Sequence, residues 1–173
     1  MSIRWIEKKI NSYLNKLLKT NKDYVIASDT DSIYVRFDEL VSMVNPKNPI
    51  DFLDTVAKEK IEPFINKSYQ QLSDYTTAYE QKMFMKREVI ADKGIWTAKK
   101  RYILNAWDVE GVRYKKPQLK IMGIEAVKSS TPAPCRQKIK EALEIIMSGS
   151  EEDLNDFLVP VSYTHLTLPT TYH

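Results

Sequence analysis

The chain has 173 residues, of which 43% are hydrophobic and 28% are charged, a composition typical of a folded globular protein. Its 26 Lys and Arg and 23 Asp and Glu residues give a formal net charge of +3, which permits nucleic-acid binding without requiring it. The single cysteine, Cys135, excludes an internal disulfide framework and a Cys-rich zinc module, and it fits a reducing cytoplasmic setting. Only four glycines occur, in neither a Walker A nor a GxGxxG pattern, which excludes a glycine-rich phosphate loop. No apolar run reaches the roughly 20 residues of a membrane helix, so we expect no membrane partner.

The first predicted element is a helix over residues 3–18. Apolar residues recur there at three- and four-residue spacing, namely Ile3, Ile6, Ile10, Tyr13, Leu14, Leu17 and Leu18. Lysines occupy the other side, namely Lys8, Lys9, Lys16 and Lys19. A cationic helix face is more often solvated than bound to nucleic acid, so the sequence assigns these lysines no ligand.

A β-hairpin is predicted over residues 24–37. The β-prone runs 24–27 and 33–35 flank five small polar residues that suit a turn. The tip of this hairpin therefore carries two carboxylates, Asp29 and Asp31.

Helix and strand alternate along the middle of the chain. Residues 51–75 are predicted to form a helix that Pro63 kinks or divides. Strands are predicted at residues 79–90, 95–107 and 119–124, with a turn at Gly111.

Two further helices are predicted near the end of the chain. The hydroxyl residues 129–131 offer N-caps before Pro132, and Ser150 with Asp153 resembles a capping box. The order helix, hairpin, helix, strands, helices indicates an α+β fold.

The last 15 residues, 159–173, contain no Asp, Glu, Lys or Arg. This loss of charge interrupts the helix predicted from residue 150. We therefore expect residues 159–173 to be a non-native or disordered tail, with a flexible native terminus as the alternative.

Asp29 and Asp31 are separated by one residue. Along an extended strand this spacing places both side chains on one face, with Cα atoms roughly 6.5–7 Å apart. Carboxylate oxygens are the ligands that Mg²⁺ prefers, usually one or two per ion, with phosphate and water completing the coordination. Asp-Thr-Asp is also an ordinary turn sequence, so the pair alone leaves a metal site and a structural turn as alternatives.

A longer pattern surrounds the aspartate pair and favours the metal site. Residues 24–35 read Tyr-Val-Ile-Ala-Ser-Asp-Thr-Asp-Ser-Ile-Tyr-Val. Matching segments accompany this motif in a fixed order, namely residues 5–15, 51–54, 62–63, 83–88, 99–111 and 119–132. In this series the chain resembles the family B DNA polymerases, and among them the replicative polymerases of T-even-type tailed phages, over about residues 2–158.

The resemblance implies DNA-directed DNA synthesis, in which a primer 3′-hydroxyl attacks the α-phosphate of a dNTP. Two Mg²⁺ ions, or Mn²⁺ in their place, would lower the hydroxyl pKa and stabilise the entering and leaving oxygens. By the match, Asp31 is expected to be a catalytic residue and direct metal ligand, and Asp29 to share the metal site. The implied partners are primer–template DNA, dNTP and, by analogy alone, a sliding clamp and other replisome proteins in the cytoplasm of an infected bacterium.

The resemblance also implies a DNA-binding stretch, which consists of Lys99, Lys100, Arg101 and Tyr102. In the family this stretch grips the new primer–template duplex along its minor groove, and cationic contacts to phosphate provide a grip independent of sequence.

Three acidic residues, Glu88, Asp108 and Glu110, match acidic family positions near the active site and are candidate active-site acids. Alternation along an unbroken strand would place Asp108 and Glu110 on the same face as Lys100 and Tyr102. We therefore expect this face to meet DNA and metal, with a solvent-exposed strand face and a salt bridge as the alternative.

The chain departs from the family at several points. Ser28 stands where the motif usually has Gly, which adds a Cβ near the site. Residues 91–96 are shorter than the glycine-rich connection of the phage enzymes. The family's other metal-binding aspartate, in an Asp-x-x-Ser-Leu-Tyr-Pro strand, is absent, as are the finger-helix lysine and an exonuclease domain.

These departures predict a fragment that is inactive alone. Residues 1–128 would form the C-terminal part of a polymerase palm, an antiparallel sheet with packed helices, and residues 129–158 the first thumb helices. The alternative from another functional class is a non-catalytic nucleic-acid-binding remnant of a polymerase, in which Asp29 and Asp31 are only turn residues.

Overall fold

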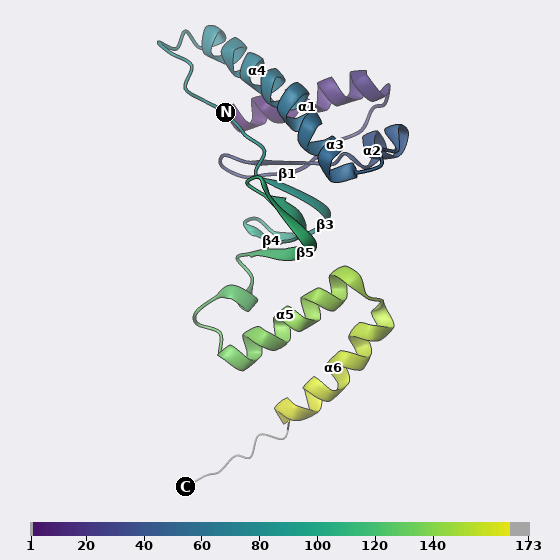
Figure 1. Cartoon of the computed structure of the whole chain (residues 1–173). Helices are drawn as coiled ribbons and strands as arrows, with labels where there is room; N and C mark the ends of the chain where they lie inside the picture. Colours follow the sequence, from purple (N-terminus) through teal and green to yellow (C-terminus); the bar gives the residue numbers. More distant parts are fainter. Residues whose placement is uncertain (1, 167–173) are drawn as a thin grey trace. The chain divides into compact units, whose positions relative to one another are not determined.

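The computed structural model describes residues 2–166 (Figure 1). In chain order its elements are α1 (Ser2–Leu18), β1 (Val25–Ser28), β2 (Ile33–Val35), α2 (Asp38–Val44), α3 (Pro49–Val56), the π-helical segment η1 (Ala57–Ile61), α4 (Glu62–Tyr75), β3 (Val89–Ala98), β4 (Arg101–Val109), β5 (Val112–Met122), the 3₁₀ turn η2 (Glu125–Val127), α5 (Ala133–Ser148) and α6 (Glu151–Leu166). The strands form two antiparallel sheets, β1-β2 and β3-β4-β5. The predicted α+β fold is confirmed. None of the helices in residues 2–166 combines the length and apolar character needed to span a bilayer.

The chain divides into two compact units. The first comprises Met1–Ile90 and Trp107–Lys115, and the second comprises Ala91–Ala106 and Lys116–His173. The strands β3, β4 and β5 each contribute residues to both units. This division does not follow the boundary expected at residues 128/129, so the assignment of palm and thumb stays a prediction.

The first unit is built around α1 and α4. Residues at four-residue spacing on α1, namely Ile6, Ile10, Leu14 and Leu18, are buried in its core. Helix α4 lies beside α1 and runs antiparallel to it (Figure 1), because Trp5 donates a hydrogen bond to the Ser68 carbonyl at 3.0 Å and Tyr13 stacks on Phe64. The amphipathic stripe predicted for the first helix is confirmed.

The predicted helix over residues 51–75 is divided, although not as a simple kink. It begins two residues earlier than predicted, at Pro49, and the Asn48 side chain caps α3 by accepting from the Ile50 and Asp51 backbone N–H groups. The π-helical segment η1 then separates α3 from α4, and Pro63 lies in the first turn of α4. A wider π turn relaxes the local i→i−4 ladder, which is where a proline lacking an N–H is tolerated.

The strand predicted at residues 79–90 is wrong over most of its length. Only its last two residues belong to β3, and residues 78–88 form neither helix nor strand. Exposed Tyr79 and Phe84 show why alternation misleads there, since neither side chain packs in a core. Helix α2 was not predicted from the sequence.

The strand predicted at residues 95–107 is divided by a turn at Lys99 and Lys100, where Lys100 has φ +61°. The predicted turn at Gly111 is confirmed, and Gly111 has φ +87°. The last predicted strand, 119–124, is part of the longer β5.

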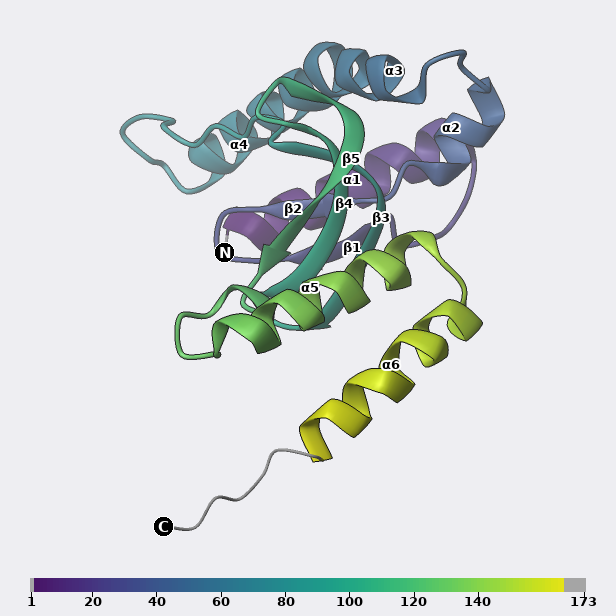
Figure 2. The ribbon, with the colours of Figure 1, turned by 60° about the horizontal axis from the view of Figure 1, so that its bottom comes forward.

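In the second unit, α5 covers the apolar side of β4 and β5 (Figure 2). Leu143 and Met147 of α5 pack with Ile103, Ile124 and Ala126. Helix α6 follows, and its Ser150 and Asp153 form the predicted reciprocal cap: the Asp153 carboxylate accepts from the Ser150 N–H and hydroxyl, and Ser150 accepts from the Asp153 N–H.

Helix α6 continues through Pro160 to Leu166 and so crosses the boundary expected after residue 158. Residues 159–166 are therefore helical, whereas residues 167–173 lie outside the described part. The prediction that 159–173 is not native protein is untested.

Candidate active site

The two aspartates lie at the tip of the β1–β2 hairpin, as predicted. Antiparallel pairs join Val25 to Val35, Ala27 to Tyr34 and Ser28 to Ile33, and the register shifts between Val25 and Ala27. This bulge leaves Ile26 as the extra residue of β1, and a bulge next to the tip bends the strand and re-aims the side chains beyond it. The tip closes with a hydrogen bond from the Asp29 N–H to the Ser32 carbonyl at 2.9 Å.

The two carboxylates differ in what they contact. Oδ1 of the half-buried Asp29 accepts from the Thr30 backbone N–H at 2.8 Å and from the Thr30 hydroxyl at 3.3 Å. Asp31 is exposed and makes no side-chain hydrogen bond or ion pair within residues 2–166. Asp29 therefore shapes the turn, while both oxygens of Asp31 are open to a ligand.

Two side chains of α1, Asn11 and Glu7, hydrogen-bond to the first strand of the hairpin. The Asn11 side chain accepts from the backbone N–H groups of Tyr24 and Val25 at 2.8 and 3.0 Å and donates to Asp23. At the end of β1, the Ser28 hydroxyl donates to the Glu7 carboxylate at 3.4 Å. These bonds fix where β1 leaves the helix and hence where its tip lies.

Tyr24 anchors the base of the hairpin from the other side. Its hydroxyl donates to Glu39 of α2 at 2.6 Å and lies 2.6 Å from the Thr20 hydroxyl. Burial raises the pKa of Tyr24, and the hydrogen bond from its hydroxyl to the Glu39 carboxylate raises this pKa further. The hydrogen bond from Lys22 lowers the pKa of Glu39. The base of the hairpin is thus fixed by charged hydrogen bonds as well as by its apolar core.

The residues at the tip fit a hard divalent cation only in part. Two carboxylates with small hydroxyl neighbours are suitable oxygen donors for Mg²⁺. Among the side chains that the structure describes, those of residues 2–161, no group of three or more His, Cys, Asp or Glu is arranged to hold a metal ion. Any ion at this tip therefore needs further oxygen ligands, which phosphate and water can supply.

The predicted DNA-binding lysines form an exposed turn in the second unit. Lys99 and Lys100 join β3 to β4, and neither side chain has a partner among the described residues. Gly123 lies directly behind this turn at φ +68°, and a Cβ built there would overlap the Lys100 carbonyl oxygen. The glycine therefore allows the end of β5 to support the turn from behind.

The other two residues of this stretch are engaged within the chain. Arg101 donates to both carboxylate oxygens of Glu125, each at 2.6 Å, and Lys128 also donates to Glu125. The hydrogen bond from Lys128 is the largest cause that lowers the pKa of Glu125 to about 2, and Arg101 adds to it. Tyr102 is half-buried, with its ring centroid 6.5 Å from that of Trp96. Lys99 and Lys100 are thus the exposed cations of the stretch.

The expectation of a shared strand face for Lys100, Tyr102, Asp108 and Glu110 is wrong. Lys100 and Glu110 lie in the turns at either end of β4, with φ +61° and +52°, so strand alternation does not apply to them. Tyr102 and Asp108 remain in β4, but the Asp108 side chain is only 1% exposed.

Asp108 is held in an ion-pair cluster that the sequence did not predict. It accepts from Arg87, from the Gly111 N–H at 3.0 Å and from Arg113 at 3.3 Å. Arg87 and Arg113 also pair with acids of α3: Arg87 donates to Asp54 at 2.6 Å, and Arg113 donates to Asp51. We call Asp51, Asp54, Lys58, Arg87, Asp108 and Arg113 the ion-pair cluster; its centre, Arg87 and Asp108, is buried, whereas Asp51 and Lys58 are exposed. Asp108 thus joins α3 to the β4–β5 turn.

Lys58 completes the cluster by donating to Asp54 at 2.9 Å. This hydrogen bond is the largest cause that lowers the pKa of Asp54. The segments matched at residues 51–54 and 83–88 therefore meet in space. The sequence signal that was available was the i, i+3 spacing of two acids on one helix, but their arginine partners are distant in the chain.

The other two candidate acids are exposed and lie close together. The Glu110 backbone N–H donates to the Glu88 carbonyl at 2.6 Å. Glu88 and Glu110 belong to the same unit as the aspartate hairpin, but their catalytic role is untested.

Comparison with known proteins gives two informative matches. A DNA-directed DNA polymerase of Escherichia phage RB69 is 42% identical over 166 residues, which is 87% of this chain and 18% of that protein. A DNA-directed DNA polymerase of Enterobacteria phage T4 is 38% identical over 172 residues, which is 91% of this chain and 19% of that protein. No family model matches the chain. The chain spans less than a fifth of these relatives, and over most of its own length it is similar to a segment of phage DNA-directed DNA polymerases, which confirms the resemblance drawn from its motifs.

Proposed function

We propose that this chain is the part of a family B phage DNA-directed DNA polymerase that carries metal-binding aspartates and a grip on the primer–template duplex. The observation that carries the proposal is the exposed, unpartnered Asp31 beside a turn-forming Asp29 at a hairpin tip. The similarity to two phage DNA polymerases supports it.

The chemistry would be nucleotidyl transfer from a dNTP to a primer 3′-hydroxyl. Bound Mg²⁺ ions would supply charge stabilisation and a lowered hydroxyl pKa. Asp31 would hold such an ion with its open carboxylate, and Asp29 would position Asp31 through its bonds to Thr30. Catalysis of this kind depends on positioning and electrostatics rather than covalent steps by the protein.

The duplex would be held by the turn at Lys99 and Lys100, whose ammonium groups are open to phosphate. Binding to the DNA backbone is independent of sequence, which a copying enzyme requires. We further propose that the whole protein works in the cytoplasm of an infected bacterium, with a sliding clamp and other replisome proteins as partners by analogy alone.

The test is a segment exchange. Residues 2–158 replace the matching segment of the RB69 polymerase, and primer extension is measured with Mg²⁺ and dNTP. We expect the exchanged enzyme to extend a primer, and Asp31→Asn to reduce extension by at least about a hundredfold, the lower range for removal of one transition-state charge contact. Duplex binding should be retained, because Asp31 would contact metal and not DNA.

Asp156→Asn is the matched control, since it removes the same charge from an exposed position on α6. It should leave extension unchanged. Near-normal extension by the Asp31→Asn enzyme would refute the assignment of Asp31 as a metal ligand.

A second candidate function is a non-catalytic nucleic-acid-binding remnant. Two observations favour it: Asp29 is engaged in the turn, and residues 2–166 contain no complete cluster of metal ligands. The remnant function would be favoured if the exchanged enzyme binds duplex DNA but does not extend a primer, while RB69 polymerase extends the primer in a parallel assay.

A further inference from the structure

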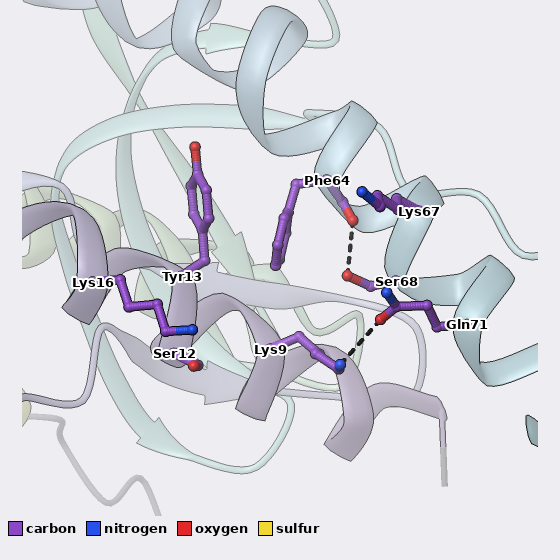
Figure 3. A pocket seen from close by; sticks show the side chains of 8 residues that line it. All are labelled: Lys9, Ser12, Tyr13, Lys16, Phe64, Lys67, Ser68 and Gln71. Atoms are coloured by element: carbon purple, nitrogen blue, oxygen red, sulfur yellow. Dashed lines mark hydrogen bonds between the residues drawn. The ribbon is translucent and has the colours of Figure 1, made fainter.

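The first unit contains a basic groove far along the chain from the Lys99–Lys100 turn. It lies between α1 and α4, has a volume of about 320 Å³, and is lined by Lys9, Ser12, Tyr13, Lys16, Phe64, Lys67, Ser68 and Gln71 (Figure 3). The lining contains three lysines and no acid. The lysine face that the sequence left without a ligand therefore becomes, in part, one wall of a groove.

The three ammonium groups reach the groove from two helices. Figure 3 shows Lys9 and Lys16 on α1 and Lys67 on α4, with the Tyr13 and Phe64 rings between them. Lys16 and Lys67 are exposed and have no hydrogen-bond or ion-pair partner in the described part of the chain. Two unneutralised cations facing one concave surface attract an anion.

The third lysine is held in place. Lys9 donates to Gln71 at 3.0 Å, and its ammonium lies 4.8 Å from the centre of the Trp5 ring. Neither partner is anionic, so the charge of Lys9 is retained at the groove. The rings of Tyr13 and Phe64, stacked at 4.5 Å between centroids, provide an apolar surface beside the cations.

The spacing of the lysines suits a polyanion better than a single small anion. Lys9 and Lys16 are two helical turns apart on the same side of α1, or about 10.5 Å along its axis. One strand of a stacked duplex advances by about 3.4 Å per phosphate and an unstacked single strand advances further, so this separation spans about two to three phosphates. Proteins that bind single-stranded nucleic acid without sequence preference usually combine a positively charged groove with aromatic side chains.

We propose that the α1–α4 groove binds the phosphate backbone of single-stranded DNA, as a site distinct from the Lys99–Lys100 turn. The choice of DNA as the source of phosphate rests on the proposed polymerase function, whereas the charge of the groove does not. Lys16 and Lys67 contact phosphate directly, Lys9 completes the cationic edge, and Ser12 supplies a hydroxyl donor.

The test is lysine acylation of the 173-residue chain, read by mass spectrometry for each lysine, which needs no variant to fold. A short oligothymidylate should slow acylation of Lys16 and Lys67 several-fold and leave exposed Lys47 unchanged. Inorganic phosphate at the same phosphate concentration is the second arm. Equal protection by inorganic phosphate would assign the groove to a small anion and overturn the proposal, and so would unchanged acylation with the oligonucleotide.

A triple variant gives an independent measurement. The triple variant Lys9→Gln, Lys16→Gln and Lys67→Gln should make the salt dependence of oligothymidylate binding less steep. The negative slope of the log binding constant against log salt should shrink in magnitude by about 2, at about 0.7 per lost phosphate contact. The matched control replaces Lys8, Lys19 and Lys47, which removes the same charge outside the groove, and its slope should not change. An equal fall in both variants would mean general attraction and would contradict a site in the groove.

The two proposals fail separately in these experiments. Acylation of Lys99 and Lys100 with duplex DNA reports on the duplex grip, whereas Lys16 and Lys67 with oligothymidylate report on the groove. Loss of extension in the exchanged enzyme with intact groove protection would reject the polymerase assignment alone. Full extension with no groove protection would reject the groove alone.

Discussion

Two glycines with positive φ illustrate how differently one residue type acts in this chain. Gly111 has φ +87° with no atom within 4 Å of the position that a Cβ would take, whereas at Gly123, with φ +68°, a Cβ would overlap the Lys100 carbonyl. We expect Gly111→Ala to cost only the left-handed strain, about 1–2 kcal/mol. Gly123→Ala should cost clearly more, since the Lys99–Lys100 turn must also move. The urea midpoints of the two variants, followed by circular dichroism, measure the difference, and equal midpoints would contradict the supporting role of Gly123.

Glu125 makes the second unit sensitive to acid. Its pKa lies at about 2 against an ordinary value of 4.5, mainly because Lys128 donates to it and also because Arg101 lies beside it. Because the pKa of Glu125 is lower in the folded state, its ionised carboxylate stabilises the fold fully at pH values above 4.5. This stabilisation is lost as the pH falls from about 4.5 toward 2. Glu125→Gln should therefore flatten the fall in urea midpoint over this interval. An identical pH profile for the variant would show that the Arg101–Glu125–Lys128 contacts do not stabilise the fold.

At this scale the sequence predicted the positions of Asp29 and Asp31 well, because a short polar run between two β-prone runs has few alternatives. It did not predict that Arg101 pairs with Glu125, since the two are 24 residues apart and a charge pattern gives no long-range partner. The same limit hid the arginine partners of Asp108, which is 1% exposed, and its predicted role as an active-site acid is untested.

At the scale of elements, β4 shows that alternation predicts the face of a side chain only within the true bounds of the strand. Lys100 and Glu110 lie just outside β4, in turns. Apolar residues lie on both sides of residues 99–101 in the run 95–107, yet the two lysines between them form a turn that Gly123, just after β5, accommodates. Helix α1, by contrast, was predicted within one residue at each end of its structural bounds, because its apolar stripe persists over the whole helix. The π-helical segment η1 has no local signal apart from Pro63.

The ion-pair cluster joins α3, Arg87 and the β4–β5 turn. Asp108 is 1% exposed and Arg87 is 9% exposed, so removing one charge leaves the other buried without its partner. We expect Asp108→Asn to destabilise the first unit by about 3 kcal/mol, the lower end for a broken buried pair, because Arg87 keeps Asp54. Urea unfolding of the chain checks this, and a change below about 0.5 kcal/mol, typical of surface positions, would contradict the structural role.

Glu110→Gln is the control for this prediction. Glu110 lies two residues further on, is exposed and has no side-chain partner within residues 2–166. It should change the unfolding free energy by less than about 0.5 kcal/mol. A comparable loss in both variants would indicate a general effect of charge at the β4–β5 turn rather than the buried pair.

At the scale of the whole molecule, the chain matches one segment of the two phage polymerases rather than their full length. The chain spans 18–19% of the two phage polymerases, and residues 2–166 hold two exposed or half-buried tip carboxylates without a third ligand. Two carboxylates on one hairpin leave a pair of ions incompletely held, and a two-metal reaction needs both ions in place. We therefore expect the 173-residue chain, incubated with primer–template, Mg²⁺ and dNTP, to bind DNA without extending the primer.

The measurement is a radiolabelled primer-extension assay run beside the segment-exchanged polymerase, which serves as the positive control because it contains the same residues in a complete enzyme. Duplex binding by the chain, measured in the same buffer, separates an inactive fragment from an unfolded one. Template-directed incorporation by the chain alone would contradict the prediction, since it would require a complete catalytic centre within these 173 residues. Absence of both binding and extension in a folded chain would instead remove the duplex grip from the proposed function, because Lys99 and Lys100 are exposed in this chain and need no further segment to meet phosphate.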